Sequence, residues 1–199
     1  VYAYSYTVTA ATGATYKDGL ATVSISGTDL PGNVGTTITS GSTFYTDTTA
    51  PVVTGISTGA RATPYKAGET VDVTVTFSEP LAPVTSAATL PLLVPGPVNA
   101  TYQAAKSDPA SGRLVFSYVF LAGQATSSLT NGTPIGTGAG ITDLALNAAT
   151  LTLPTTGGSE LASNPGNVVV DAIAPTVLSV TGTSGTYGVG QAVPVFVKF

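Results

Sequence analysis

Two pairs of oxygen-bearing side chains stand out in this sequence. Asp29 and Asn33 are four positions apart, and so are Asp143 and Asn147. Carboxylate and amide oxygens suit a hard cation such as Ca²⁺. The pairs do not match the dense Asp series of an EF-hand loop. Each Asp could instead bond the backbone amides of its own turn, as Asp does in Asx turns.

Three further carboxylates complete the set of candidate cation ligands. Asp47 and Asp171 each stand four positions before a Pro, in the phrases TDTTAP and VDAIAP, and Glu79 follows an alternating apolar stretch. Each of the two phrases offers few carboxylates of its own. Calcium is therefore the one cofactor that the sequence suggests, with Asp29, Asn33, Asp47, Glu79, Asp143, Asn147 and Asp171 as its candidate ligands.

Two Asn residues satisfy the acceptor rule for N-glycosylation. Asn99-Ala-Thr and Asn131-Gly-Thr both have the form N-x-S/T without a Pro in the middle. Thr and Ser are so common in this chain that such matches also arise by chance. A weakly charged surface of Thr, Ser and Ala would nevertheless be more soluble with attached sugar, so we expect glycosylation at these two positions.

Most enzyme chemistry lacks its side chains in this sequence. The chain has no Cys and no His, which excludes the usual zinc sites, Cys nucleophiles and Ser-His-Asp triads. Its 10 carboxylates are thinly spread, with no pair identifiable at facing strand positions, as an acid–base pair of a glycosidase would require. We therefore expect that the protein is not an enzyme.

Composition favours strands and turns. Of the 199 residues 43% are apolar and only 8% charged, with 23 Gly and 14 Pro beside many Thr and Val. Such a mixture predicts an all-β fold. The scattered basic residues and the net charge of −4 indicate no nucleic-acid partner. No apolar run approaches the ~18–20 residues that span a bilayer, and no signal peptide opens the chain.

The sequence repeats itself at a domain-sized interval. Asp47 and Asp171 are 124 positions apart, and YKAGETVDVTVTF (65–77) returns as YGVGQAVPVFVKF (187–199) at a spacing of 122. Upstream, YSYTV (4–8) matches FSYVF (116–120) and TDLPGN (28–33) matches TDLALN (142–147). We therefore expect three parts: residues 1–46 end one module, 47–170 form a complete module and 171–199 begin the next. The excerpt would belong to a longer protein.

Strands can be recognised within each copy. Val71, Val73, Val75 and Phe77 alternate with polar residues, the period-2 pattern of a half-buried strand. Leu114, Phe116, Tyr118 and Phe120 share one face of another strand, and their counterparts in the first copy are Tyr2, Tyr4, Tyr6 and Val8. About seven short strands per copy predict tandem immunoglobulin-like β-sandwich modules.

The ordered motifs DTTAP, YKAGETVDVTVTFSEPL, GITDLALNAATLTLP and VVVDAIAP resemble immunoglobulin-like or cadherin-like repeats of giant cell-surface proteins. Such repeats occur in bacterial adhesins and in algal mastigoneme glycoproteins. The resemblance implies an extracellular structural spacer within a filament or fibre, and calcium at module junctions. Its partners would be neighbouring modules and other filament components. The alternative is an adhesion module that binds a glycan or another cell-surface protein. The longest irregular stretch, 121–140, contains no aromatic residue, which favours the spacer.

Overall fold

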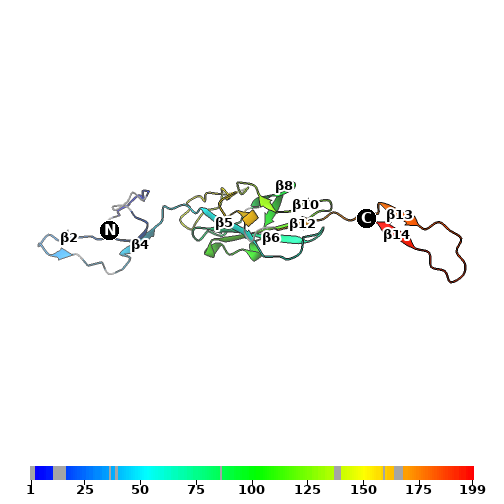
Figure 1. Cartoon of the computed structure of the whole chain (residues 1–199). Coiled ribbons are helices and arrows are strands. Elements are labelled where there is room, and N and C mark those ends of the chain that lie inside the picture. Colours follow the sequence, from blue (N-terminus) through cyan, green and yellow to red (C-terminus); the bar gives the residue numbers. More distant parts are fainter. Residues whose placement is uncertain are drawn as a thin grey trace.

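The computed structural model describes residues 3–10, 17–35, 37–38, 40–85, 87–136, 140–158, 160–163 and 168–199. Tyr2, one of the expected strand residues, lies outside them. The described chain forms a central β-rich body with a narrow piece at each end (Figure 1). Its strands pair antiparallel, and its helical elements are three short 3₁₀ turns, η1 (Ala104–Lys106), η2 (Pro109–Ser111) and η3 (Leu161–Ser163). The expected all-β class is confirmed.

One antiparallel sheet organises the central body. Its strands run in the order β11-β7-β8-β9-β6-β5. Their bounds are β5 (Val53–Thr58), β6 (Thr70–Phe77), β7 (Thr89–Val94), β8 (Gly96–Tyr102), β9 (Arg113–Val119) and β11 (Thr130–Asn131). The long strands β6 and β9 lie side by side near the middle of the sheet, and the register pairs Val73 with Phe116.

The alternation in β6 explains which face of the sheet is buried. Val71, Val73, Val75 and Phe77 are buried, while Asp72 and Thr76 between them are exposed. Successive strand residues point to opposite faces, so one face carries the core and the other meets solvent. The expected half-buried strand is confirmed for these residues.

Strand β9 departs from strict alternation. Leu114 and Phe116 are buried as expected, but Val115 between them is buried too. The cause is the segment that holds η1 and η2, which is hydrogen-bonded to β9. Gln103 N donates to Val115 O at 2.8 Å, and Val115 N donates to Ser107 Oγ at 2.8 Å.

Irregular segments rather than a second full sheet cover the buried face. The short pair β10 (Ala125–Thr126) and β12 (Val170–Asp171) forms one small sheet. Leu129, Ile135, Ile141, Leu153 and Leu161 bring apolar side chains to the core from the loops and short elements after residue 126. β12 includes Asp171, so the central body runs past the expected boundary at residue 170.

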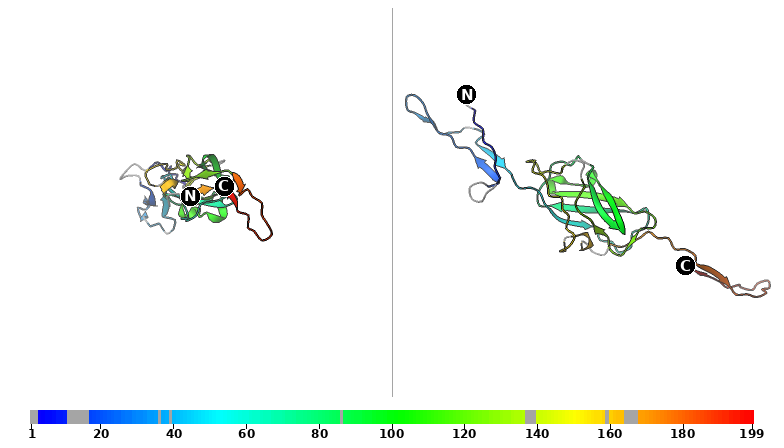
Figure 2. Two further views of the ribbon diagram at one scale, coloured as in Figure 1. Left: turned by 45° about the vertical axis from the view of Figure 1, so that its right-hand side comes forward. Right: turned by 90° about the horizontal axis from the view of Figure 1, so that it is seen from above.

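The end pieces are ribbons of paired strands. At the N-terminal end β1 (Gly19–Thr22) pairs with β4 (Thr43–Thr46), and β2 (Gly27–Thr28) pairs with β3 (Val34–Gly35). At the C-terminal end β13 (Ser179–Gly182) pairs with β14 (Val195–Lys198). Figure 2 shows the two end pieces on opposite sides of the central body. Among the described residues there is no helix long and apolar enough to cross a membrane.

The C-terminal ribbon reproduces the register of β5 and β6. Ile56 pairs with Val75 in the central body, and Val180 pairs with Val197 in the C-terminal ribbon. These residues are counterparts at the repeat spacings of 124 and 122 positions. The same sequence phrase therefore forms the same hairpin in both copies.

Candidate metal centre

Three carboxylates meet where the N-terminal piece joins the central body. Asp47, Glu79 and Asp143 each offer an oxygen, and these oxygens all lie within 4.8 Å of one another. We call them the junction triad. Asp47 and Glu79 are partly buried, and Asp143 is only 2% exposed. Negative charges this close repel one another, so the triad favours a bound cation or a proton.

Glu79 is placed by the turn that follows β6. Ser78 N donates to Val52 O at 2.9 Å, and Val52 N donates to Ser78 Oγ at 3.1 Å. Two residues past Glu79, Leu81 N donates to Pro109 O at 2.8 Å. These bonds fix the backbone on both sides of the carboxylate beside the incoming chain.

Asp143 is held by its partner in the Asp–Asn pair. Asn147 donates to it twice, from its backbone N to Oδ1 at 2.9 Å and from Nδ2 to Oδ2 at 2.8 Å. The same Nδ2 also donates to Asp47 O at 3.1 Å. The loop therefore has the turn bonding expected of an Asx residue. It also ties the linker, residues 47–52 between β4 and β5, to the central body.

The first copy has the same arrangement away from the junction triad. We call it the Asp–Asn clamp: an Asn donates two hydrogen bonds to the Asp four positions before it. Asn33 donates to Asp29 from its backbone N at 2.7 Å and from Nδ2 at 2.9 Å. The two residues flank the turn between β2 and β3, at the far end of the N-terminal piece (Figure 1). Among the described residues, the junction triad is the one group of at least three acidic side chains placed closely enough for a metal ion.

Asp171 lies at the opposite junction. Its Oδ1 accepts a hydrogen bond from Ile173 N at 3.2 Å, just as Asp47 Oδ1 accepts one from Thr49 N at 3.1 Å. The two boundary phrases thus form the same turn. At the repeat spacing of 122, the counterpart of Glu79 would fall two positions beyond Phe199, outside the given sequence.

Glu79 gives an independent sign that a positive group belongs in the triad. Its Oε1 atom is buried and has no hydrogen-bond partner. Burial raises the pKa of Glu79, and the charges of Asp47, Asp143 and Asp18 raise it further. A buried carboxylate oxygen without a partner is costly. A hard divalent cation coordinated by this oxygen would remove that cost, so the residues fit such an ion.

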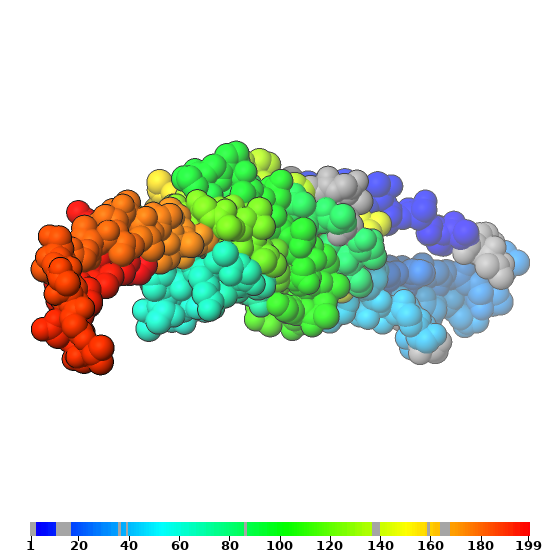
Figure 3. Space-filling view, turned by 90° about the vertical axis from the view of Figure 1, so that its right-hand side faces the viewer, coloured from blue at the N-terminus to red at the C-terminus, as the bar shows by residue number. Residues whose placement is uncertain are grey.

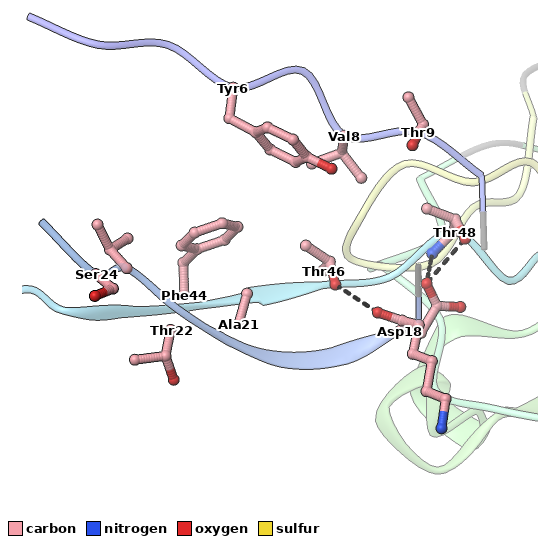
Figure 4. Close-up of a pocket in the computed structure, with 12 residues that line it drawn as sticks. Tyr6, Val8, Thr9, Asp18, Ala21, Thr22, Ser24, Phe44, Thr46 and Thr48 are labelled. Carbon is pink, nitrogen blue, oxygen red and sulfur yellow. Dashed lines mark hydrogen bonds between the residues drawn. The ribbon is translucent and has the colours of Figure 1, made fainter. Parts of the chain in front are cut away.

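Asp18 is a functional candidate that the sequence did not reveal. It accepts hydrogen bonds from Thr48 N at 2.8 Å and Thr48 Oγ1 at 2.9 Å (Figure 4). Thr49 Oγ1 donates to it as well, at 2.5 Å. These bonds, that from Thr49 Oγ1 foremost, lower the pKa of Asp18. Asp18 also lines a hollow of about 610 Å³ together with Asp47 and Glu79. Asp18 lies near the junction triad because β1 pairs with β4. No local sequence pattern predicts this pairing.

The two glycosylation candidates lie in different surroundings. Asn99 is exposed on β8. Asn131 is 6% exposed, and its Nδ2 donates to Gly132 O and Pro154 O. Its Oδ1 accepts a hydrogen bond from Leu161 N at 3.1 Å. Only Asn99 therefore presents a free side-chain amide at the surface of the folded body.

The arrangement offers side-chain oxygens that suit the coordination of a hard cation. The junction triad gathers oxygen ligands from a linker and two loops, with Asp18 beside it from the preceding piece. Oxygen ligands of this kind, placed between two parts of the chain, are those that hard cations prefer. Comparison with protein-family models, curated proteins and solved structures found no match to this chain.

Proposed function

We propose that this chain is a spacer segment of a long extracellular filament or cell-surface fibre, built of tandem immunoglobulin-like sandwich modules. Its role is mechanical: it sets distance, and its partners are neighbouring modules and other components of the filament. The repeated hairpin register and the end-to-end arrangement of the three parts support this role. The low charge and the exposed acceptor Asn99 agree with a glycosylated extracellular surface.

The observation that carries the proposal is the short, bonded junction between the N-terminal piece and the central body. Pro51 is buried, and its carbonyl accepts a hydrogen bond from Thr150 N at 2.7 Å. Pro also restricts the residue before it to extended geometry. The chain thus passes from β4 to β5 under restraint at each step, whereas a flexible tether would leave these groups free.

We further propose that the junction triad binds Ca²⁺ and that the ion stiffens this joint. Asp47 belongs to the linker, whereas Glu79 and Asp143 belong to the central body. An ion held by all three ties the linker to the body. It also neutralises charges that would otherwise push the linker away.

Small-angle X-ray scattering on engineered tandems of two, four and six copies of residues 47–170 tests the spacer role. We expect the maximum dimension to grow in proportion to the number of copies, in calcium. Compact particles whose dimension grows much more slowly than the number of copies would overturn the proposal.

Calorimetric titration of CaCl₂ into the chelator-treated chain tests the ion. Glu79→Gln should abolish the heat of binding and the accompanying rise in melting temperature. Asp29→Asn is the matched control, because Asp29 has the same Asp–Asn clamp but does not belong to the junction triad. This variant should leave the heat of binding and the rise in melting temperature unchanged. No heat with the unmodified chain, or equal losses in both variants, would refute calcium at the triad.

A further inference from the structure

The central body contains the one Asn–Gly step of the sequence, Asn131–Gly132. Such a step is chemically labile. The amide nitrogen of the Gly attacks the carbonyl carbon of the Asn side chain, ammonia leaves, and a cyclic imide remains. Water then opens the imide to an aspartate or an isoaspartate. Gly favours the attack because it has no side chain in the way and its backbone is the least restricted.

The fold requires the Asn of this pair. Asn131 lies in the edge strand β11 and is 6% exposed. Its Nδ2 donates to Gly132 O at 3.1 Å and to Pro154 O at 3.0 Å. Its Oδ1 accepts a hydrogen bond at 3.1 Å from the backbone N of Leu161, which is fully buried in the core. The side chain therefore fastens two covering segments to the edge of the sheet.

The fold requires the Gly as well. Gly132 N donates to Pro91 O in the neighbouring strand β7 at 3.0 Å. A Cβ added to Gly132 would lie 3.2 Å from Pro91 Cβ and 3.4 Å from Pro91 Cγ. A larger residue would therefore push the edge strand away from β7, because a close-packed interior leaves no room for it. Packing thus keeps a labile pair in the sequence.

Both reacting groups are engaged in the folded body. The attacking nitrogen is Gly132 N, which is bonded to Pro91 O. The leaving group is Asn131 Nδ2, which is held between two carbonyl oxygens. Ring closure would break these bonds inside a buried site, where unpaired polar groups are costly. The reaction therefore requires the central body to open first.

We propose that Asn131–Gly132 is a one-way modification site: it deamidates when the central body opens, and the product keeps the body from closing again. A carboxylate at position 131 has no hydrogen to donate to Gly132 O and Pro154 O, so oxygen would face oxygen in a buried place. An isoaspartate would also add a methylene to the backbone and disturb the pairing of β11 with β7.

The proposal goes beyond the spacer role and does not depend on calcium. Deamidation needs only water and time, so the chance of modification grows with the time that a body spends open. A body that is briefly pulled open closes unchanged, whereas one that is held open becomes unable to refold. The pair therefore limits how long an opened body can still recover.

Ser184→Asn supplies a matched reference, because it places an Asn–Gly step at 184–185 in the same chain. Ser184 and Gly185 are exposed between β13 and β14. Figure 3 shows this C-terminal ribbon, in orange and red, projecting beyond the central body. The same chemical step is then present once in a buried place and once at the surface.

Peptide mapping by mass spectrometry follows both steps in this variant at mildly alkaline pH. In guanidinium chloride we expect Asn131 to deamidate as fast as the reference. In the native chain the reference should still react, and Asn131 should react at least about 1,000-fold more slowly, since only the small opened fraction is reactive. Equal rates in the native chain, or a slower reaction of Asn131 in guanidinium chloride, would overturn the proposal.

Refolding tests whether the step is one-way. The partly deamidated variant is returned from guanidinium chloride to buffer, and size-exclusion chromatography separates folded from unfolded chains before mapping. We expect chains modified at position 131 only in the unfolded fraction, and chains modified at position 184 equally in both fractions. An equal distribution of both products between the fractions would overturn the proposal.

Asn131→Asp isolates the effect of the carboxylate from that of the isoaspartate backbone. It should leave the central body unfolded or lower its melting temperature clearly. Asn99→Asp is the control, because it makes the same change at an exposed position on β8, and it should leave the melting temperature unchanged. Equal melting temperatures of the two variants would contradict the proposed effect of the product.

Discussion

Val73 and Val195 occupy equivalent positions in two copies of one repeat, but their surroundings differ. Val73, which pairs with Phe116 across β6 and β9, is fully buried, whereas Val195 is 61% exposed. Both lie in hairpins of the same register. The comparison separates two contributions: the local pattern and turn suffice to form the hairpin, but burial of its apolar face requires strands from elsewhere in the module.

The largest expected difference between these regions comes from placing a charge at the two equivalent positions. Val73→Asp buries an unpaired carboxylate and should cost about 5 kcal/mol or more, much of the stability of an ordinary domain. Val195→Asp should change unfolding of the central body by less than about 0.5 kcal/mol, because surface substitutions act weakly.

Denaturant unfolding followed by far-ultraviolet circular dichroism measures both variants. Equal destabilisation by the two variants would mean that the C-terminal ribbon is packed into a core, contrary to the comparison. A mild effect of Val73→Asp would mean that the central sheet is not the stabilising unit.

The second contrast is between the two Asp–Asn clamps. Asn147 bonds Asp143 and also Asp47 O in the linker, whereas Asn33 bonds Asp29 on an exposed loop. Asn147→Ala should cost about 1–3 kcal/mol, since it leaves partly buried acceptors without partners. Asn33→Ala should cost about 0.5 kcal/mol or less. Urea unfolding compares them, and a larger effect at Asn33 would contradict the role of the junction.

Features that depend on residues close together in the sequence could be predicted from it. The alternation of Val71 to Phe77 predicted a half-buried strand, and the repeat predicted which residues are equivalent. The all-β class followed from composition. A second full sheet over the core was expected, but loops supply Leu153 and Ile135 instead. Leucine burial needs only an apolar neighbour, so composition cannot tell a strand from a covering loop.

The candidate site was predicted only in part, for a similar reason. Asp47 was named as a possible ligand from its boundary phrase, Asp143 from its spacing to Asn147 and Glu79 from its place after an alternating strand. The structure brings the three together. Asp29, Asn33 and Asp171 lie elsewhere. Asp18 was missed because its place beside Thr48 follows from the pairing of Gly19 with Thr46 across many intervening residues.

A third prediction concerns pH in the absence of metal. The pKa of Glu79 is raised, first by burial and then by the neighbouring carboxylates. The folded state therefore favours the protonated form. The contribution of protonated Glu79 to the free energy of unfolding is fully present below the ordinary Glu pKa of about 4.3. It is lost as the pH rises through the higher pKa that Glu79 has in the folded state.

Glu79→Gln removes this titration and should therefore raise the stability at pH 7 in chelator while flattening the pH profile above pH 4. Melting temperatures across pH 4–8 compare it with Asp108→Asn, which removes a carboxylate outside the triad. If Glu79→Gln lowers the melting temperature at neutral pH without calcium, the carboxylate is not strained in the folded state.

The smallest expected effect concerns one backbone position in the equivalent loops. Leu146 has a φ of 70°, and its counterpart Gly32 has a φ of 98°. A Cβ is disfavoured in this region and Gly is not. Leu146 is also exposed, so its side chain contributes little packing. Leu146→Gly should therefore stabilise the central body by up to about 1 kcal/mol, less the entropy that Gly loses on folding.

Gly32→Leu should instead lower the stability of the loop that carries Asp29, which amide exchange at Asn33 measures. If Leu146→Gly destabilises the body, then the exposed leucine packs against a partner at the junction, and this part of the surface is an interface.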